Sequence, residues 1–317
     1  MENTMPLCAG IDTSKNKLDI AIHGAATCLT VDNTPAGLRQ LVRALRRAGV
    51  GRVGIEATGG YERCAVKELR AEGFEVRLLQ PLQVKALARL QLRRAKNDRI
   101  DAALIAACTA LIDPREARDE VRIEPMIDGL TFVEQVEEDI VRSKTRLEKT
   151  VDPRLRRLIA ADIRRLQVRR SAELQRIAKM LRQHEDLAHR LALVMSIPGI
   201  GERTALAIVL RMPEIGAISR EQAAALAGLA PFDRDSGQHT GQRHIAGGRS
   251  RLRKSLYAAA LPAAFRWNPA LISLYKRLIA RGKSHKLALV ACARKLIIFA
   301  NTVVQRNQPW HAQTSAA

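Results

Sequence analysis

The feature that most constrains the fold of this chain is a long run of heptad-like apolar positions in its middle. Apolar side chains recur at three- and four-residue steps from about Val133 to Val151 and again from Leu155 to Leu181, on otherwise highly charged sequence. Asp152-Pro153 separates the two runs, because a residue before proline disfavours helical geometry. The pattern predicts two long helices that fold back as an antiparallel coiled coil, a segment typical of spacing or dimerisation.

Before this segment, short strands and helices alternate. Apolar stretches at residues 7–11, 18–22 and 28–31 predict three strands, the first two joined by a polar turn over residues 12–16. A helix over 35–49, a strand over 53–57, a helix over 61–72, a strand over 74–79 and helices from 82 onward and over 98–112 follow. Three strands and then a β-α-β-α order predict an α/β N-terminal domain.

After the heptad-like segment the pattern is entirely helical. Helices are predicted over residues 220–229, 250–264, 269–281 and 286–306, with a polar loop over 231–248. The Gly-Ile-Gly turn at Gly199 and Gly201 resembles the hairpin of helix-hairpin-helix DNA-binding modules, in which backbone N–H groups face a phosphate. An ordinary turn between two helices is the alternative. The chain is thus divided into residues 1–115, 116–190 and 191–317.

The charge of the chain favours a polyanionic partner. The 317 residues include 53 Lys and Arg against 32 Asp and Glu, a formal net charge of +21. Residues 232–317 alone hold fifteen Lys and Arg and two acidic residues, a balance of +13. Basic residues that neutralise phosphates release condensed counterions, so this region is expected to contact nucleic-acid backbones.

Other sequence features argue against several classes of protein. No run of about 18 apolar residues suggests a membrane span, and the first residues lack the pattern of a signal peptide. The cysteines are scattered singly, which favours reduced thiols in a cytoplasm over disulfides or a zinc site. They are Cys8, Cys28, Cys64, Cys108 and Cys292.

Four acidic residues stand out by position. Asp12 closes the first strand, Glu56 ends a later apolar strand, and Asp98 and Asp101 lie three residues apart at a helix start. Carboxylates at neighbouring strand ends repel one another unless a cation lies between them, and oxygen ligands suit Mg²⁺ or Mn²⁺. Taken singly, Asp98 could be a helix cap and Asp12 a turn residue. Together, in this order, the four match the layout of ribonuclease-H-like nucleases.

Seven short motifs carry a resemblance to a known family. Residues 10–15 (GIDTSK), 54–61 (GIEATGGY) and 96–102 (KNDRIDA) resemble the acidic DEDD motifs of IS110-family insertion-sequence transposases, relatives of the Piv and MooV DNA invertases. Residues 196–203 (SIPGIGER), 226–231 (LAGLAP), 235–237 (DSG) and 247–256 (GGRSRLRKSL) resemble the C-terminal transposase domain of the same family. The match covers essentially the whole chain in the expected order.

The resemblance implies a fold and a chemistry. Residues 1–115 would form a RuvC-like domain whose Asp12, Glu56, Asp98 and Asp101 hold Mg²⁺, residues 116–190 a coiled-coil dimerisation segment, and residues 191–317 an all-α transposase domain. Ser236 matches the family's nucleophilic serine, which would form a phosphoserine link to DNA; without the resemblance it is an ordinary loop residue. Donor and target double-stranded DNA, a non-coding guide RNA and a homodimer or higher oligomer are the implied partners, with no membrane involved.

Several residues are candidates for contacts with nucleic acid. The cationic stretch after the serine fits phosphate positioning better than base reading, although a solvated basic face is the alternative. Aromatic residues make up 3% of the chain, so few platforms exist for stacking on single strands. The candidates are Lys15, Lys96, Arg99, Gly199, Gly201, Arg234, Arg243, Arg249, Arg251, Arg253 and Lys254.

Two other classes of function stay open at this point. A RuvC-like metal-dependent nuclease, such as a junction resolvase, would cut DNA with water and would tolerate loss of the Ser236 hydroxyl. A non-catalytic architectural protein would tolerate neutral substitutions of Asp12 or Glu56. The reading favoured by the motifs is a DNA transposase or recombinase that works in the bacterial cytoplasm, at the nucleoid.

Overall fold

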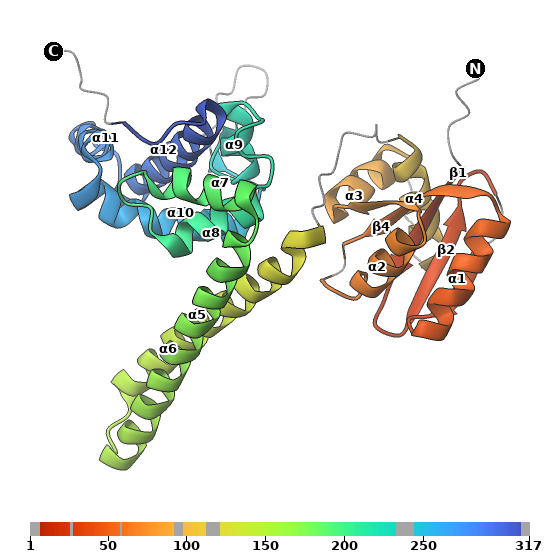
Figure 1. Ribbon diagram of the computed structural model, residues 1–317, viewed down its shortest axis with the longest axis horizontal. Coiled ribbons are helices and arrows are strands. Elements are labelled where there is room, and N and C mark those ends of the chain that lie inside the picture. The colour runs from red at the N-terminus through yellow and green to blue at the C-terminus, as the bar shows by residue number, and fades with distance from the viewer. Residues whose placement is uncertain are drawn as a thin grey trace. The chain divides into compact units, whose positions relative to one another are not determined.

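The computed structural model describes residues 7–25, 28–57, 59–91, 98–111, 121–232 and 244–311, without the side chains of residues 98, 99 and 121. The chain divides into two compact units, residues 1–117 and 118–317. In Figure 1 the first unit is a sheet covered by helices, and the second is a helical body from which a two-helix stalk extends.

The first unit is built on a five-stranded mixed sheet. Its order is β3-β2-β1-β4-β5, with β1, β2 and β3 antiparallel and β1, β4 and β5 parallel. The strands are β1 (Leu7–Thr13), β2 (Lys17–Ile22), β3 (Cys28–Asp32), β4 (Val50–Glu56) and β5 (Glu75–Leu79). The prediction of an α/β N-terminal region is therefore confirmed.

Helices cover both faces of this sheet. On one face, α1 (Pro35–Arg47) and α2 (Arg63–Ala71) share a core with alternate residues of β1 and β4, such as Ile11 and Ile55. On the other face lie α3 (Pro81–Leu90) and α4 (Asp98–Leu111), which pack on each other through a smaller core. The predicted cap at Thr34 is present, since its side chain accepts a hydrogen bond from the Gly37 N–H at the start of α1.

The first strand is longer than its apolar residues predict. Asp12 and Thr13 pair with Asp19 and Leu18 of β2, so the ladder continues through Thr13. The prediction that Asp12 lies in the turn between the first two strands is therefore wrong, because backbone pairing continues past the last apolar residue. This places Asp12 within a strand, where its side-chain direction is set by the alternation of the sheet.

The stalk is a helical hairpin. A short 3₁₀ turn (η1, Val121–Ile123) leads into α5 (Glu124–Lys149), and α6 (Pro153–Arg182) returns beside it. Asp152 caps α6 by accepting hydrogen bonds from the backbone N–H groups of Arg154 and Leu155. Val136, Ile140 and Ile163 form a buried cluster between the two helices, as the heptad pattern predicts.

The body of the second unit is mostly helical, and the prediction that it is all-α is wrong, because the two ends of the predicted polar loop pair as short antiparallel strands. It contains α7 (Glu185–Met195), α8 (Glu202–Arg211), α9 (Arg220–Leu226), α10 (Ser250–Pro262), a π-helical turn η2 (Ala263–Trp267), α11 (Pro269–Ala280), α12 (His285–Arg306) and the short strands β6 (Pro231–Phe232) and β7 (His244–Ile245). Its core includes Met126 and Leu130 of α5 and Ile177 and Leu181 of α6. The base of the stalk thus shares a core with the body, and the three-part division of the chain stays a prediction.

Helix α12 is long and apolar enough to cross a membrane by length and composition. Half of its most apolar window is buried within the second unit. Cys292, Leu296 and Ile297 are fully buried in the core that α12 forms with its neighbours α7, α9, α10 and α11. These contacts are those of a core helix.

Candidate active site and basic surfaces

Two of the four predicted acidic residues lie at the same edge of the sheet. Strands β1 and β4 are parallel neighbours, and their register pairs Ile11 with Ile55. Asp12 and Glu56 are the next residues of these strands, so they lie beside each other at the carboxyl ends. Both are partly buried. Parallel pairing therefore brings together two carboxylates that are 44 positions apart in the sequence.

Two glycines let α4 lie directly on these strands. A Cβ atom on Gly10 would overlap the backbone nitrogen of Ala106 and the carbonyl oxygen of Ala102. A Cβ atom on Gly54 would overlap Oγ1 of Thr109. Since side chains alternate across a strand, residues two positions further on point to the same face. Asp12 and Glu56 therefore face the side of the sheet that α4 covers.

The other two predicted acidic residues belong to this helix. Asp98 is the first residue of α4, and its side chain lies outside the described residues. Asp101, one turn further on, is partly buried and directly precedes Ala102, which contacts Gly10. The start of α4 thus brings the second half of the acidic set to the face of the sheet that Asp12 and Glu56 share.

Analysis of the sequence missed a fifth carboxylate on this face. Asp19 of β2 is directly opposite Asp12 in the antiparallel ladder, so the two side chains point the same way. It is 6% exposed, accepts a 2.6 Å hydrogen bond from Oγ1 of Thr30, and lies 3.2 Å from Nζ of Lys17. Lys17 therefore compensates buried negative charge beside Asp12. The alternation of Lys17 and Asp19 in an apolar strand was the available signal.

The donor set suits a hard divalent cation. Carboxylate oxygens are the ligands that Mg²⁺ and Mn²⁺ prefer, and these belong to two strand ends and one helix start on a single face. Within the described part of the chain, no three His, Cys, Asp or Glu residues gather closely enough to hold a metal ion. Asp12, Glu56 and Asp101 belong to that part, so these three predicted ligands share a face of the sheet but are not close enough together to hold an ion, and the side chain of Asp98 lies outside the described residues.

The cationic helix of the second unit is engaged within the protein. Four of the residues predicted to contact phosphate lie at or near the start of α10, and each has an intramolecular partner. Arg249 forms two hydrogen bonds to Glu214, at 2.9 and 2.6 Å. Arg251 donates to Glu134 at 2.9 Å and Lys254 to Glu138 at 2.9 Å, while Arg253 donates to the carbonyl oxygens of Gly228 and Gly247. A role in phosphate binding stays a prediction, and it would have to compete with these contacts.

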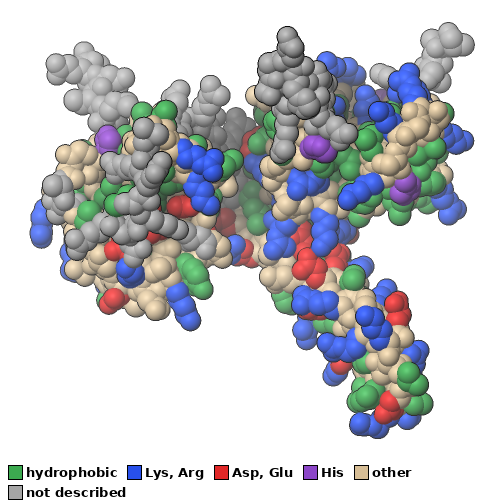
Figure 2. Space-filling model, turned by 180° about the vertical axis from the view of Figure 1, so that it is seen from behind, with side chains coloured by type: hydrophobic (Ala, Val, Ile, Leu, Met, Phe, Trp, Pro, Cys, Tyr) green, Lys and Arg blue, Asp and Glu red, His purple; other side chains and the backbone are tan. Residues whose placement is uncertain are grey.

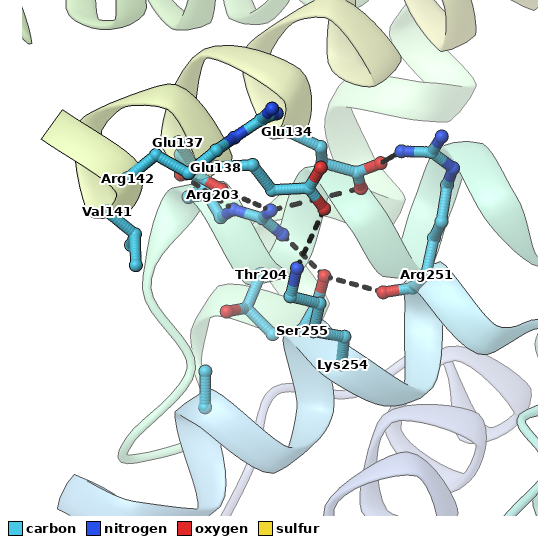
Figure 3. Close-up of a pocket in the computed structure, with 11 residues that line it drawn as sticks. Glu134, Glu137, Glu138, Val141, Arg142, Arg203, Thr204, Arg251, Lys254 and Ser255 are labelled. Atoms are coloured by element: carbon cyan, nitrogen blue, oxygen red, sulfur yellow. Dashed lines mark hydrogen bonds and ion pairs between the residues drawn. The ribbon is translucent and has the colours of Figure 1, made fainter. Parts of the chain in front are cut away.

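Glu134 of α5 is the centre of this network (Figure 3). Its carboxylate is buried and lies 2.8 Å from Arg211, 2.9 Å from Arg251 and 3.8 Å from Arg203. Arg203 also contacts Glu137 of α5 and donates to the Ser255 hydroxyl of α10. The network lines a cavity of about 680 Å³ and ties the base of the stalk to α8 and α10.

The Arg249–Glu214 pair lowers the pKa of the Glu214 carboxyl. Burial is the largest single influence and would raise the pKa of Glu214, but the hydrogen bonds and positive charge of Arg249, together with a backbone hydrogen bond, outweigh it. The pKa of Glu214 therefore lies below its ordinary value. Such a shift makes the folded state of the second unit more stable when Glu214 is ionised.

The Gly-Ile-Gly turn connects α7 and α8. Gly199 has a φ of +96°, and a Cβ atom there would overlap Cβ of Ala263, so packing requires glycine at this position. The turn is fastened by Asn268, which donates to the carbonyl oxygen of Pro198. Gly201 is exposed where α8 begins. The structure explains Gly199 by packing, and contact of this turn with a phosphate stays a prediction.

The remaining predicted site residues are only partly visible. Lys15 is exposed in the turn between β1 and β2. The structure describes neither Ser236 nor the side chain of Arg99. The positively charged residues Lys96, Arg234 and Arg243 also lie outside the described residues. The short strands β6 and β7, which pair Pro231 with Ile245 and Phe232 with His244, lie at the two ends of the segment that contains Ser236.

Comparisons with known proteins identify the class of protein. A family model described as a transposase, of the IS110 DEDD type, matches residues 9–160, and a model described as the IS116/IS110/IS902 transposase family matches residues 191–276. The acidic sheet edge lies in the first match and α10 in the second. The chain belongs to the IS110 family of transposases, a class that recombines DNA.

Individual relatives agree with this family. A pilin gene-inverting protein of Moraxella bovis is 25% identical over 314 residues, covering 95% of this chain and 96% of the relative. A protein of the same name from Moraxella lacunata has the same identity and coverage. An uncharacterized 43.6 kDa protein of insertion element IS110 from Streptomyces coelicolor is 34% identical over 113 residues, or 35% of this chain and 28% of that protein.

Proposed function

We propose that this protein is a transposase that cuts and rejoins the DNA strands of a mobile element, using a Mg²⁺-binding carboxylate site and Ser236 as nucleophile. The observation that carries the proposal is the packing of α4 on Gly10 and Gly54. Because of this packing, α4 covers the face of the sheet to which Asp12 and Glu56 point. Asp98 and Asp101 lie at the start of the same helix.

The topology of the first unit supports a RuvC-like, ribonuclease-H-like domain. Three antiparallel strands are followed by two parallel ones in the order β3-β2-β1-β4-β5, with the acidic residues on the first and fourth strands and on a later helix. In this arrangement Asp12 and Glu56 lie beside each other at the carboxyl ends of β1 and β4. Hydrophobic cores lie on both sides of the sheet and hold these strand ends in place.

The metal ion would be held by Asp12, Glu56, Asp98 and Asp101. When bound, Mg²⁺ or Mn²⁺ would supply positive charge to the attacking and leaving oxygens of a phosphodiester. The fold determines where these ligands lie. Strand pairing brings Asp12 beside Glu56, and Asp101 belongs to α4, which covers the face of the sheet to which both point. Lys17 balances the charge of the buried Asp19, which lies opposite Asp12.

Ser236 would supply the covalent step. Its Oγ forms a bond to the scissile phosphorus and loses its proton to a base, for which Asp235 and His239 are the nearest candidates in the sequence. The bond between phosphorus and the leaving strand oxygen breaks, and that oxygen takes up a proton as a hydroxyl. Attack by another strand hydroxyl on the phosphoserine reverses the exchange and releases Ser236. One P–O bond forms and one breaks in each step, so rejoining requires no ATP.

The partners follow from the same proposal. Donor and target DNA are the substrates, and the two relatives named for inverting a pilin gene are consistent with conservative strand exchange. We further propose that a non-coding guide RNA selects the sequences, that the protein works as a homodimer or higher oligomer, and that it acts in the cytoplasm on the nucleoid. The net charge of +21 supports binding to both kinds of nucleic acid.

The test is to look for DNA that is covalently joined to the protein. The protein is incubated with DNA and RNA from the genomic flanks of its gene in the presence of Mg²⁺, and trapped complexes are digested and analysed by mass spectrometry. We expect a nucleotide-linked peptide that contains Ser236. Ser236→Ala should lose the adduct and strand cleavage together, while DNA binding persists.

Ser250→Ala is the matched control, because Ser250 is an exposed serine at the start of α10 in the same unit. It should keep both cleavage and the adduct. Efficient strand cleavage by Ser236→Ala would remove the serine from the chemistry and would favour the hydrolytic nuclease. Cleavage that survives Asp12→Asn would exclude the proposed metal site.

A further inference from the structure

Helix α12 borders a long groove on the second unit. Three neighbouring hollows of about 610, 390 and 400 Å³ follow one another along this helix. Ala291 and Arg294 line both the first and the second hollow, and Lys295 and Ile298 line both the second and the third. The hollows are therefore continuous, and we call them the α12 groove. A helix of 22 residues gives it a length of about 33 Å.

The groove follows the side of α12 that the core leaves uncovered. Leu287, Val290, Ala291, Ile298 and Thr302 line it at helical spacing, and none of them is fully buried. Apart from Val303, which also lines the third hollow, the buried residues of α12 lie on the other side of the helix. The apolar character that makes α12 resemble a membrane span thus includes the exposed floor of this groove.

The rim of the groove is strongly basic. Five Lys and Arg residues line the three hollows, against the single acidic Glu221, which is paired with Arg220. In the described part of the chain, the other four have no carboxylate partner. These four are Lys283, Arg294, Lys295 and Arg306.

This is the opposite of α10, whose Arg249, Arg251 and Lys254 are all neutralised by glutamates. Arg294 differs further, because its Nε is buried and has no hydrogen-bond partner among the described residues. This nitrogen is too deeply buried to meet a ligand in the groove, so the accessible cations of the rim are the exposed Lys283, Lys295 and Arg306. The α12 groove therefore has cations available for an anion, whereas those of α10 are already occupied.

The two ends of the groove indicate what kind of anion. At one end, Pro231, His244 and Ile245 of the β6–β7 hairpin line the first hollow, next to the segment that contains Ser236. At the other end, the rings of Phe299 and Trp310 lie 4.4 Å apart by their centroids and line the third hollow. A polyanion that also offers flat apolar groups would use the rim, the floor and the aromatic end together.

We propose that the α12 groove binds a single strand of DNA; this rests on the proposed function. Phosphates would lie along the cationic rim, and unpaired bases would contact the apolar floor and the Phe299–Trp310 pair. A duplex keeps its bases stacked inside and would leave that floor unused. DNA is the occupant because the family to which this chain belongs recombines DNA, and the groove presents cations that have no carboxylate partner in the described part of the chain.

The test compares two triple variants that each remove three exposed cations. The groove variant is Lys283→Ala/Lys295→Ala/Arg306→Ala, and the control variant is Lys276→Ala/Arg277→Ala/Lys286→Ala, whose positions on α11 and α12 do not line the hollows. Affinity for a labelled single-stranded DNA is measured by fluorescence anisotropy over a range of salt concentrations. The groove variant should bind at least about tenfold more weakly, and its salt slope should fall by about 2, since each single-strand phosphate contact contributes roughly 0.7. The control variant should stay close to the wild type.

A second measurement reports on the aromatic end. Trp267→Phe leaves Trp310 as the single tryptophan, since the chain has two. Adding single-stranded DNA should quench its fluorescence, and the groove triple variant should lose that quenching. Unchanged Trp310 fluorescence on binding would contradict placement of the strand in the groove.

Equal weakening by the two triple variants would overturn the proposal in favour of diffuse charge. A groove variant that loses affinity for duplex DNA or for RNA, but keeps its affinity for single-stranded DNA, would overturn it as well. The two levels of proposal are separable. If the groove variant loses single-strand binding selectively while the wild type forms no protein-linked DNA, the groove stands and the serine chemistry fails. If the groove variant forms protein-linked DNA as well as the wild type does, the serine chemistry stands and the groove proposal fails.

Discussion

Gly10 and Gly54 each lie two residues before an acidic residue of the proposed site, and in each case α4 occupies the space of a side chain. The obstacles differ. At Gly10 the helix backbone at Ala102 and Ala106 is in the way, whereas at Gly54 it is the side chain of Thr109. A backbone cannot be trimmed by mutation, but a side chain can. An added Cβ would overlap α4 at both glycines, but only at Gly54 can a second substitution remove the overlapping atom.

Gly54→Ala should destabilise the first unit by about 1–3 kcal/mol, because the new methyl group overlaps Oγ1 of Thr109. Thr109→Ala should restore much of the loss, since its remaining Cβ would lie 3.0 Å away, at the limit of tolerated contacts. Gly10→Ala should destabilise by at least as much, and Thr109→Ala should not rescue it. Urea unfolding of the four variants measures this. Rescue of Gly10→Ala by Thr109→Ala would contradict the described packing of α4.

The carboxylates themselves should matter for cleavage and not for binding. Asp12→Asn, Glu56→Gln and Asp101→Asn should each lower strand cleavage by about 100-fold or more, the order of effect of removing a group that stabilises transition-state charge. Affinity for DNA should change little, because it comes mainly from basic residues elsewhere. Cleavage assays and anisotropy on the same preparations separate the two. Asp98→Asn should lower cleavage in the same way, and because asparagine caps a helix about as well as aspartate, a capping role alone would leave the activity intact.

At the scale of secondary-structure elements, α10 is held from several sides. Arg251 and Lys254 tie it to α5, Arg253 ties it to the Gly228 and Gly247 carbonyls, and Arg249 at its N-cap ties it to Glu214 after α8. These contacts join segments up to 117 positions apart. The side chains of α10 therefore hold distant segments of the second unit together. Its positive charges have this structural role whether or not phosphate also binds there.

The Arg249–Glu214 pair should make stability depend on pH. The folded state lowers the pKa of Glu214, so the stabilisation is present above the ordinary pKa of a glutamate, about 4.3, and is lost as the pH falls through the lowered value. Arg249→Ala should therefore reduce stability at pH 7 by about 1 kcal/mol or less, given that the pair is about one-third exposed. Urea unfolding at pH 7 and pH 3 checks this, and Lys283→Ala serves as the control. If Arg249→Ala loses as much unfolding free energy at pH 3 as at pH 7, the loss would come from packing and not from the ion pair.

At the scale of the whole molecule, the stalk leaves apolar surface that its own hairpin does not cover. Val151 is 88% exposed and Leu158 54%, although both lie on the apolar stripes of the heptad pattern. Val168 and Val141 are likewise exposed along the stalk. Figure 2 shows hydrophobic side chains at the free end of the stalk among Lys, Arg, Asp and Glu. Such stripes favour association with a second copy, and recombination joins two duplexes.

Val151→Glu/Leu158→Glu should shift the protein toward monomers, because a charge on each exposed stripe opposes burial against a partner. Leu82→Glu is a matched control at another exposed leucine, 75% exposed on α3. Light scattering at micromolar concentration, with nucleic acid present, measures the mass. A wild-type protein that is monomeric under these conditions would rule out self-association through the stalk.

Much of the local structure could be predicted from the sequence, because it depends on residues that are neighbours along the chain. Thr34-Pro35 marks the start of α1, Asp152-Pro153 separates α5 from α6, and alternation of apolar residues marks the strands. The acidic candidates were also visible, because each lies at the end of a strand or the start of a helix. The length of β1 was not, since it depends on pairing with β2 after the apolar residues end.

The sequence by itself thus determined the elements, their order and the chemical types of the candidate site residues. Only the tertiary structure decided which charges are available. Arg251 and Arg294 look equivalent in the sequence, yet one meets Glu134 from a distant helix and the other has a buried nitrogen without an acceptor. The same holds for Asp19, which β-sheet register places opposite Asp12. The physical reason is that periodicity is a local property, whereas desolvation and ion pairing depend on which distant side chains the packed core brings within a few ångströms.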